Sequence, residues 1–208
     1  MYGLHVKFDH SGAIMGLFVT ILILCALIIY LVMIYNGLVG LRNQAKNAFS
    51  QIDVQLQRRY DLIPNLVEVA RKYMQHERET LEAIIEARNT AKSAAQKAAE
   101  NQADNASMTA LQGAEGRLEG VLSRFFALSE AYPDLKANQN MVQLHEELIS
   151  TENRIAFARQ AYNDSVMFYN IKRESFPDGM IANSCGFRGM HLWQAANTDI
   201  QQPVNVRF

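Results

Sequence analysis

A long stretch without charge near the N-terminus constrains this chain more than any other feature of its sequence. No Asp, Glu, Lys or Arg occurs between Ser11 and Leu41, and residues 13–35 are almost wholly apolar. A helix of these 23 residues would be roughly 35 Å long, enough to cross a hydrocarbon core about 30 Å thick. A soluble surface helix of this length would need a polar face, and none is present. The sequence therefore predicts a transmembrane helix at 13–35.

The flanks of this segment indicate an uncleaved anchor and its orientation. A signal peptide has a basic start, roughly 7–15 apolar residues and a small-residue cleavage site. Here Lys7 is balanced by Asp9, the apolar run is longer, and residues 34–36 are Ile-Tyr-Asn. Arg42 and Lys46 follow the segment closely, so the positive-inside rule predicts an outside N-terminus and a cytoplasmic main domain. The expected location is the bacterial cytoplasmic (inner) membrane, crossed once.

The remainder of the chain has the three-four apolar spacing of amphipathic helices. We expect one helix from 41 to about 100, kinked or split at Pro64, a second over 108–131 capped by Ser107, and a third over 139–174. The buried stripe expected on the third helix is Leu144, Leu148, Ile155, Tyr162, Val166 and Tyr169.

These elements predict an all-α protein: one N-terminal transmembrane helix followed by an antiparallel bundle of three to four long helices with coiled-coil packing. The expected division is a flank at 1–12, the membrane helix at 13–35, the bundle at 36–176 and a C-terminal tail at 177–208. Phe187 and Trp193 are expected to pack against the bundle, and the last dozen residues to be mobile.

The His, Cys and Glu residues do not have the spacing in sequence that metal sites or nucleophilic catalysis require. A zinc-peptidase helix needs a second His four residues after the first, but Thr80 and Ile149 hold those positions after His76 and His145. These two histidines and their neighbouring glutamates are therefore interpreted as surface residues. The formal net charge of −1 excludes nucleic-acid binding through bulk positive charge.

A di-iron bundle would need Glu-x-x-His on two helices, and no such motif occurs. Glu147 and Glu152 are interpreted as ion-pair partners or polar core residues. Cys185 has only His191 nearby in sequence, which is too little for a nucleophile. We expect no metal, no cofactor and no catalytic site.

Charge is distributed unevenly along the bundle. Residues 36–75 contain six Lys/Arg and three acidic residues, whereas residues 76–174 contain eleven and fifteen. Positive-inside topology alone could explain this pattern. Alternatively, a membrane-proximal basic set of Arg42, Lys46, Arg58 and Arg59 holds the bundle against anionic lipid.

Two Tyr-Asn pairs occur on the third helix. Tyr162 and Tyr169 are seven residues apart, close to two helical turns, and therefore share one face. One interpretation places them in the core with their hydroxyls at the rim. The other makes them a candidate interface for self-association, where Tyr is favoured.

Several segments together resemble the bacterial LemA family from about residue 30 to residue 190. They include the sequences at 58–68 (RRYDLIPNLVE), 86–89 (EARN), 130–138 (EAYPDLKAN) and 151–156 (TENRIA). The resemblance implies one N-terminal membrane helix and a helical bundle, with no established reaction. It also implies, for some relatives, a part in forming or organising bacterial membrane compartments, and for others a gene neighbouring a membrane metalloprotease. The first dozen residues and the tail after Met190 match no family pattern.

Three functions follow from these observations. The favoured one is a non-enzymatic, membrane-anchored scaffold that self-associates as a homo-oligomer and organises or shapes the bilayer. The alternative is an adaptor that binds another membrane protein, such as a protease. An enzyme is disfavoured because the His, Cys and Glu spacings do not fit a catalytic site.

Overall fold

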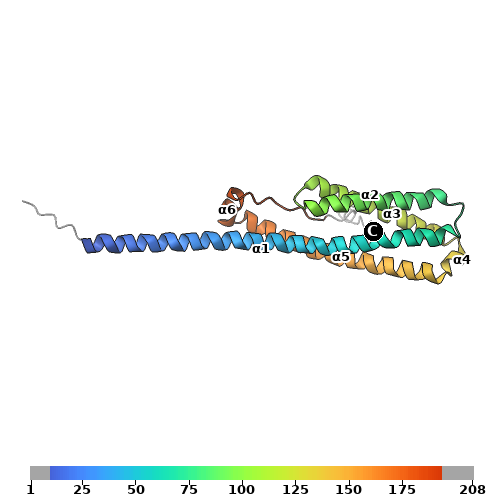
Figure 1. The fold of residues 1–208 in the computed structure, drawn as a ribbon, viewed down its shortest axis with the longest axis horizontal. Helices are drawn as coiled ribbons and strands as arrows, with labels where there is room; N and C mark the ends of the chain where they lie inside the picture. The colour runs from blue at the N-terminus through green and yellow to red at the C-terminus, as the bar shows by residue number, and fades with distance from the viewer. Residues whose placement is uncertain (1–9, 194–208) are drawn as a thin grey trace, which may run out of the picture.

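The computed structural model describes residues 10–193, and all regular structure in that part of the chain is helical. The helices are α1 His10–Arg71, α2 Arg78–Glu100, α3 Asn105–Ser129, α4 Pro133–Lys136, α5 Gln139–Glu174 and α6 Asp178–Ser184. The N-terminal part of α1 projects from the bundle, while its remainder lies with α2, α3 and α5 (Figure 1). This confirms the predicted all-α fold with an apolar N-terminal helix and an antiparallel bundle.

The first helix is a continuous rod of 62 residues, about 93 Å at the usual rise. It passes through Pro64 without breaking and ends at Arg71, so of the two alternatives at Pro64, a kink or a split, the split is excluded. The predicted helix 41–100 is instead divided between Arg71 and Arg78. Proline has no N–H to donate to the carbonyl four residues earlier. Arg88 Nε of α2 donates to that Tyr60 carbonyl at 2.9 Å, which replaces the missing bond.

The turn between α1 and α2 lies at the end of the bundle away from the projecting part of α1 (Figure 1). It contains neither Gly nor Pro, so local sequence gives little sign of it. Tertiary hydrogen bonds tie it to the connection between α3 and α5. Tyr132 Oη donates to Glu77 at 3.1 Å, and Asn138 Nδ2 donates to Tyr73 Oη at 3.1 Å.

The core is built from the apolar stripes that the sequence predicts. Between residues 45 and 70, α1 buries nine apolar side chains, mostly at three- and four-residue spacing, and α5 buries six. They are Ala45, Phe49, Ile52, Leu56, Tyr60, Ile63, Leu66, Val67 and Ala70 on α1, and Met141, Leu148, Ile155, Tyr162, Val166 and Tyr169 on α5, while Leu144 of the expected stripe is only partly buried. α1 packs along α5 and against α2, and α2 packs against α3. The buried face of α2 is rich in alanine, which lets neighbouring helices approach closely.

Side-chain caps define where α3 and α5 begin. Asp104 accepts a hydrogen bond from the Ser107 backbone N–H at 2.9 Å, so α3 begins at Asn105 and Asp104, not Ser107, is its cap. Asn138 caps α5 in the same way through the Met141 N–H. α5 spans Gln139–Glu174 as predicted from the sequence.

The chain beyond α5 returns to α1 and packs against it. α6 contacts both α1 and α5, and Gly186, with φ of 72°, turns the chain into an extended segment over residues 187–193. Phe187 and Trp193 are buried, as predicted. The Phe187 ring meets the Tyr35 ring edge-on at 5.5 Å. The last dozen residues, predicted to be mobile, lie outside the described part.

Candidate functional site

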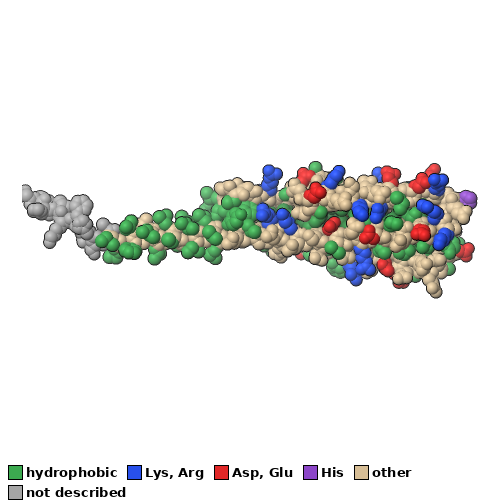
Figure 2. Space-filling model, in the orientation of Figure 1, with side chains coloured by type: hydrophobic (Ala, Val, Ile, Leu, Met, Phe, Trp, Pro, Cys, Tyr) green, Lys and Arg blue, Asp and Glu red, His purple; other side chains and the backbone are tan. Residues whose placement is uncertain are grey.

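The projecting part of α1 is the strongest functional feature of the described residues. Almost every large apolar side chain between Ile14 and Tyr35 is exposed, and Ile34 is the first to be buried. α1 contains a window of mean hydropathy 3.2, and it is the one described helix long and apolar enough to cross a membrane. Figure 2 shows hydrophobic side chains along this segment and no charged ones, whereas charged side chains of both signs cover the bundle. A soluble protein would bury such a segment, so this geometry indicates a single-pass membrane anchor.

Two of the four predicted membrane-proximal basic residues lie far from that segment. Arg58 and Arg59 follow Tyr35 by 23 and 24 residues, which is roughly 35 Å along a straight helix. Arg58 is 51% exposed and lies 3.7 Å from Glu147. Arg59 is only 4% exposed. The prediction that these two side chains meet lipid is therefore wrong, because the continuous α1 carries them away from it.

Arg42 and Lys46 do lie nearer the apolar segment, about two and three helical turns beyond Tyr35 along α1. Arg42 stacks over the Phe187 ring at 5.1 Å, and Lys46 is exposed. Together with Arg188 from the tail they line a groove of about 200 Å³ that also contains Glu100 of α2. The fold therefore assembles a basic groove from α1 and the C-terminal segment. The Arg188 contribution escaped the sequence argument because it is distant in sequence.

The two tyrosines proposed as an interface are buried in the chain's own core. Tyr162 and Tyr169 are both 0% exposed, and burial raises the pKa of each hydroxyl. Tyr162 Oη donates to the His191 carbonyl at 2.8 Å, and Tyr169 Oη donates to the Arg188 carbonyl at 2.7 Å. The interface interpretation is wrong, and these residues instead hold the C-terminal segment.

The asparagines that follow the tyrosines complete this clamp. Asn163 accepts from the Trp193 N–H at 2.7 Å and donates to its carbonyl at 2.9 Å. Asn170 makes the equivalent pair with Met190, at 3.1 and 2.8 Å. Seven residues of helix rise about 10.5 Å, and three extended residues span about 10 Å. This matched spacing explains why the Tyr-Asn pair occurs twice, seven residues apart.

A buried ion-pair cluster ties three helices together. Arg59 Nη1 of α1 lies 3.1 Å from Glu115 of α3 and 2.9 Å from Glu152 of α5. Tyr60 Oη donates to the other oxygen of Glu115. Burial raises the pKa of the Glu115 carboxyl, while the Arg59 charge and the Tyr60 hydrogen bond oppose that rise. The charges are paired with one another, so we interpret the cluster as a structural link.

Residues considered for metal or nucleophilic chemistry are dispersed. Within residues 10–193 no three His, Cys, Asp or Glu side chains gather as metal ligands would. His76 is exposed, whereas His145 is partly covered and stacks on Phe126 with ring centroids 4.1 Å apart. Cys185 is an exposed free thiol. His191, the histidine nearest to it in sequence, accepts a hydrogen bond from Tyr162 Oη through its backbone carbonyl and so belongs to the segment that the tyrosines hold.

The outward face of α5 is a feature that the sequence argument missed. Val142, Ile149 and Phe157 are exposed there, and Phe168 and Ile171 continue the same face toward α6. The signal was a second apolar stripe on the helix 139–174, opposite the one assigned to the core. Glu146, Asn153 and Asp164 are interspersed along that face.

Comparisons with known proteins agree with this architecture. The LemA family model matches residues 48–208, so the match includes the tail after Met190 that showed no family pattern. The chain is 27% identical over 203 residues to magnetosome protein MamQ of Magnetospirillum gryphiswaldense, covering 89% of this chain and 75% of that protein. Magnetosome proteins MamQ 1 and MamQ 2 of Paramagnetospirillum magneticum are 26% identical with the same coverage. Because the family model spans most of the bundle and the tail, this chain belongs to the LemA family.

Proposed function

We propose that this protein is a non-enzymatic scaffold, anchored once in the bacterial cytoplasmic membrane, that self-associates and organises the bilayer around it. The observation that carries the proposal is the exposed apolar stripe on α5, in particular Val142, Ile149 and Phe157. Phe157 is 74% exposed although it lies in the middle of a long, ordered helix. Val142, Ile149 and Phe157 recur seven and eight residues apart on one helix face, with Glu146 and Asn153 between them, and apolar anchors at such helical spacing are used in protein–protein contacts.

The position of the stripe favours a second copy of the chain as the partner. α5 packs its opposite face on α1, so the stripe faces away from the bundle along the length of the rod. Copies anchored in one membrane have the same orientation, so this face of α5 lies at the same distance from the bilayer in each copy. Contact between equivalent faces is the usual arrangement of a homodimer. Self-association through α5 would therefore place neighbouring anchors side by side.

The basic groove supports the proposed orientation and the proposed lipid contact. Arg42 and Lys46 lie about 10 and 16 Å beyond Tyr35 along α1, outside a headgroup layer about 5–8 Å thick but within about a Debye length of it. Each such cation gains on the order of 1 kcal/mol near an anionic leaflet. We infer that the bundle lies in the cytoplasm, on the side where anionic lipid and positive flanks coincide.

The family relationship supports a role in membrane organisation. The relatives above are named as magnetosome proteins, and the resemblance implies for some members a part in forming membrane compartments. We propose a role of the same class for this chain, and we assign it no cargo and no reaction.

The test is the particle mass of the full-length protein in mild detergent, measured by light scattering. We expect a uniform assembly for the native chain and a monomer for the variant carrying Ile149→Lys and Phe157→Lys. A matched variant with Thr90→Lys and Thr109→Lys adds the same charge to exposed positions of α2 and α3 and should assemble like the native chain. A monomeric native chain would refute self-association.

An adaptor function is the second candidate, and a groove favours it. A hollow of about 210 Å³ between α3 and α5 is lined by Leu122, Phe126, Leu148 and Ile149, with Arg59 and Glu152 beside it. A helix of another membrane protein could use this groove with the α5 stripe. A photo-crosslinking residue at 157 in living cells separates the two functions. Crosslinks between copies support the scaffold, and crosslinks to a different membrane protein support the adaptor.

A further inference from the structure

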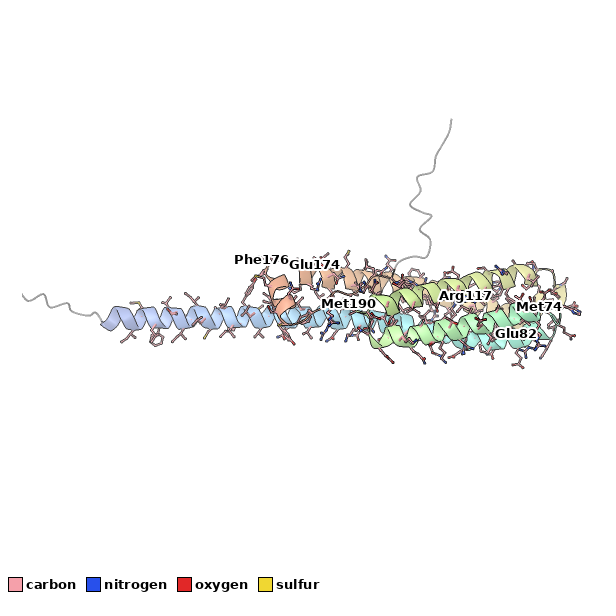
Figure 3. The ribbon with its side chains drawn as sticks, turned by 90° about the horizontal axis from the view of Figure 1, so that it is seen from above. Met74, Glu82, Arg117, Glu174, Phe176 and Met190 are labelled. Carbon is pink, nitrogen blue, oxygen red and sulfur yellow. The ribbon has the colours of Figure 1, made fainter. Side chains whose placement is uncertain are left out.

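The turn into α6 exposes two large apolar side chains at the membrane-facing end of the bundle. Phe176 is 84% exposed and Met180 is 65% exposed. Figure 3 shows Phe176 beside the projecting part of α1, at the opposite end of the bundle from Met74. Figure 2 shows the hydrophobic surface of α1 continuing onto this end of the bundle. The apolar turn is therefore continuous with the surface that indicates a membrane anchor.

The packing of this turn sets its depth relative to the bilayer. Ile34 and Leu38 are the first two α1 side chains to be buried, and they lie where α6 and the C-terminal segment meet α1. A Cβ on Gly37 would come within 2.9 Å of the Lys172 side chain, so the end of α5 lies directly over Gly37. A hydrocarbon core about 30 Å thick takes about 20 residues, so a span that begins at Ala13 ends near Met33. The α6 turn thus lies within about one helical turn of the hydrocarbon boundary.

The charged side chains around the turn form ion pairs within the protein. Lys172 Nζ lies 2.9 Å from Asp178, and Arg173 Nη1 lies 2.9 Å from Glu174. Ser175 Oγ donates to the Ile171 carbonyl at 2.7 Å. Pairing of this kind reduces the cost of moving polar groups out of bulk water. The charged side chains can also stay at headgroup level while the two apolar side chains go deeper.

We propose that the α6 turn is a second membrane contact, in which Phe176 and Met180 insert into the leaflet beside the end of the α1 span. An aromatic ring and a thioether next to paired charges suit the boundary between headgroups and acyl chains. With one membrane-spanning helix alone, the anchor and bundle could tilt together in the bilayer, whereas a second contact fixes their angle to it. The inference rests on the membrane part of the proposed function and is independent of self-association.

An environment-sensitive fluorophore on a single cysteine tests this contact in the full-length chain. In a Cys25→Ala, Cys185→Ser background, Phe176→Cys carries the probe, and Met180→Cys serves as an independent second position. Phe157→Cys is the matched control, an exposed phenylalanine on α5 about 25 Å farther along the rod. A fourth protein keeps Cys25 as the labelled site, within the predicted span. All are reconstituted in phosphatidylcholine–phosphatidylglycerol vesicles containing nitroxide-labelled lipid.

We expect lipid nitroxides to quench the probes at 176 and 180 several-fold more than the probe at 157, and the probe at 25 to be quenched by deeply placed nitroxides. Equal, weak quenching at 176, 180 and 157 with strong quenching at 25 would overturn the second contact and leave the anchor intact. No quenching at 25 would overturn the anchor and this contact together. A blue-shifted but unquenched probe at 176 would show that another copy of the chain, not lipid, covers the turn, and would also overturn the proposal.

Discussion

Replacing Pro64 by alanine tests how α1 remains continuous from the membrane segment to the far end of the bundle. Pro64 leaves the Tyr60 carbonyl without its helical partner, and Arg88 Nε occupies that carbonyl at 2.9 Å. Alanine at 64 would provide the missing N–H and restore the i→i−4 bond. The Arg88 hydrogen bond should then become redundant. The two residues are thus predicted to be energetically coupled although they lie on different helices.

The size of the coupling follows from the contacts. A hydrogen bond from a charged donor contributes about 1.5–3 kcal/mol, so Arg88→Met in the native background should destabilise the fold by about 2 kcal/mol. Asp61, 4.0 Å from Arg88 and largely exposed, adds little to that loss. Proline costs about 3 kcal/mol in a helix interior, but Arg88 already offsets part of this. Pro64→Ala should therefore stabilise by about 1 kcal/mol, and Arg88→Met should then cost under about 0.5 kcal/mol.

The assay is a double-mutant cycle on the full-length protein in mild detergent, with urea unfolding followed by far-ultraviolet circular dichroism. Arg78→Met is the matched control, because Arg78 is exposed on the same helix and pairs only with Glu82 among the contacts described. Its effect should be equal in both backgrounds. If Arg88→Met costs as much with alanine at 64 as with proline, the reasoning fails, and Arg88 stabilises the bundle by some other contact.

Three further predictions concern the bundle and its C-terminal segment. Arg59→Met should destabilise by about 3–5 kcal/mol at neutral pH, because it leaves Glu115 buried without its cation. In this variant the folded-state pKa of Glu115 should lie further above its unfolded value. At pH values between the two, the folded chain binds more protons than the unfolded chain, so the loss of stability should shrink as pH is lowered. A loss of stability that is independent of pH would contradict this. Asn163→Ala should remove two hydrogen bonds to Trp193, shift its fluorescence to the red and cost about 1–3 kcal/mol, and unchanged emission would show that the clamp does not hold the segment. Ala91→Leu should overpack the fully buried face of α2 and lower stability by about 1–3 kcal/mol in urea titrations, and a neutral effect would show that the face has spare room.

The features that the sequence predicted well depend on local signals. The bounds of α5 follow from Asn138 as its cap and from Pro177 just after its end. The anchor follows from composition alone. The choice between a kink and a split at Pro64 could not be made from the sequence, because the group that replaces the missing hydrogen bond, Arg88, comes 24 residues later on another helix. No periodicity in the chain encodes that pairing.

The functional residues were harder to predict because charge and ring type do not reveal a partner. Arg59 counted as one more positive charge near the membrane, yet Glu115 and Glu152 neutralise it inside the bundle. Tyr162 and Tyr169 had the correct spacing for a shared face, but what binds them is the backbone of an extended segment about 20–30 residues later. A side chain that hydrogen-bonds to backbone groups requires no particular residue type in the segment that it binds. The sequence of that segment therefore gives no sign of the contact.

The continuity of α1 links the membrane segment mechanically to the rest of the molecule. A flexible linker at residues 36–40 would let the bundle rotate, so that its surfaces had no fixed direction relative to the bilayer. Here one helix runs through that region, and α6 and Phe187 pack on it at Ile34–Leu38. Any turn of the anchor in the membrane is therefore transmitted to α5. Side-by-side contact through the α5 stripe would in turn fix the angle between neighbouring anchors, which is the geometric requirement for a scaffold that shapes a membrane. Inserting a short Gly-Ser stretch after Gly40 should preserve membrane binding and bundle folding while abolishing uniform assemblies, and assemblies of unchanged size would refute this coupling.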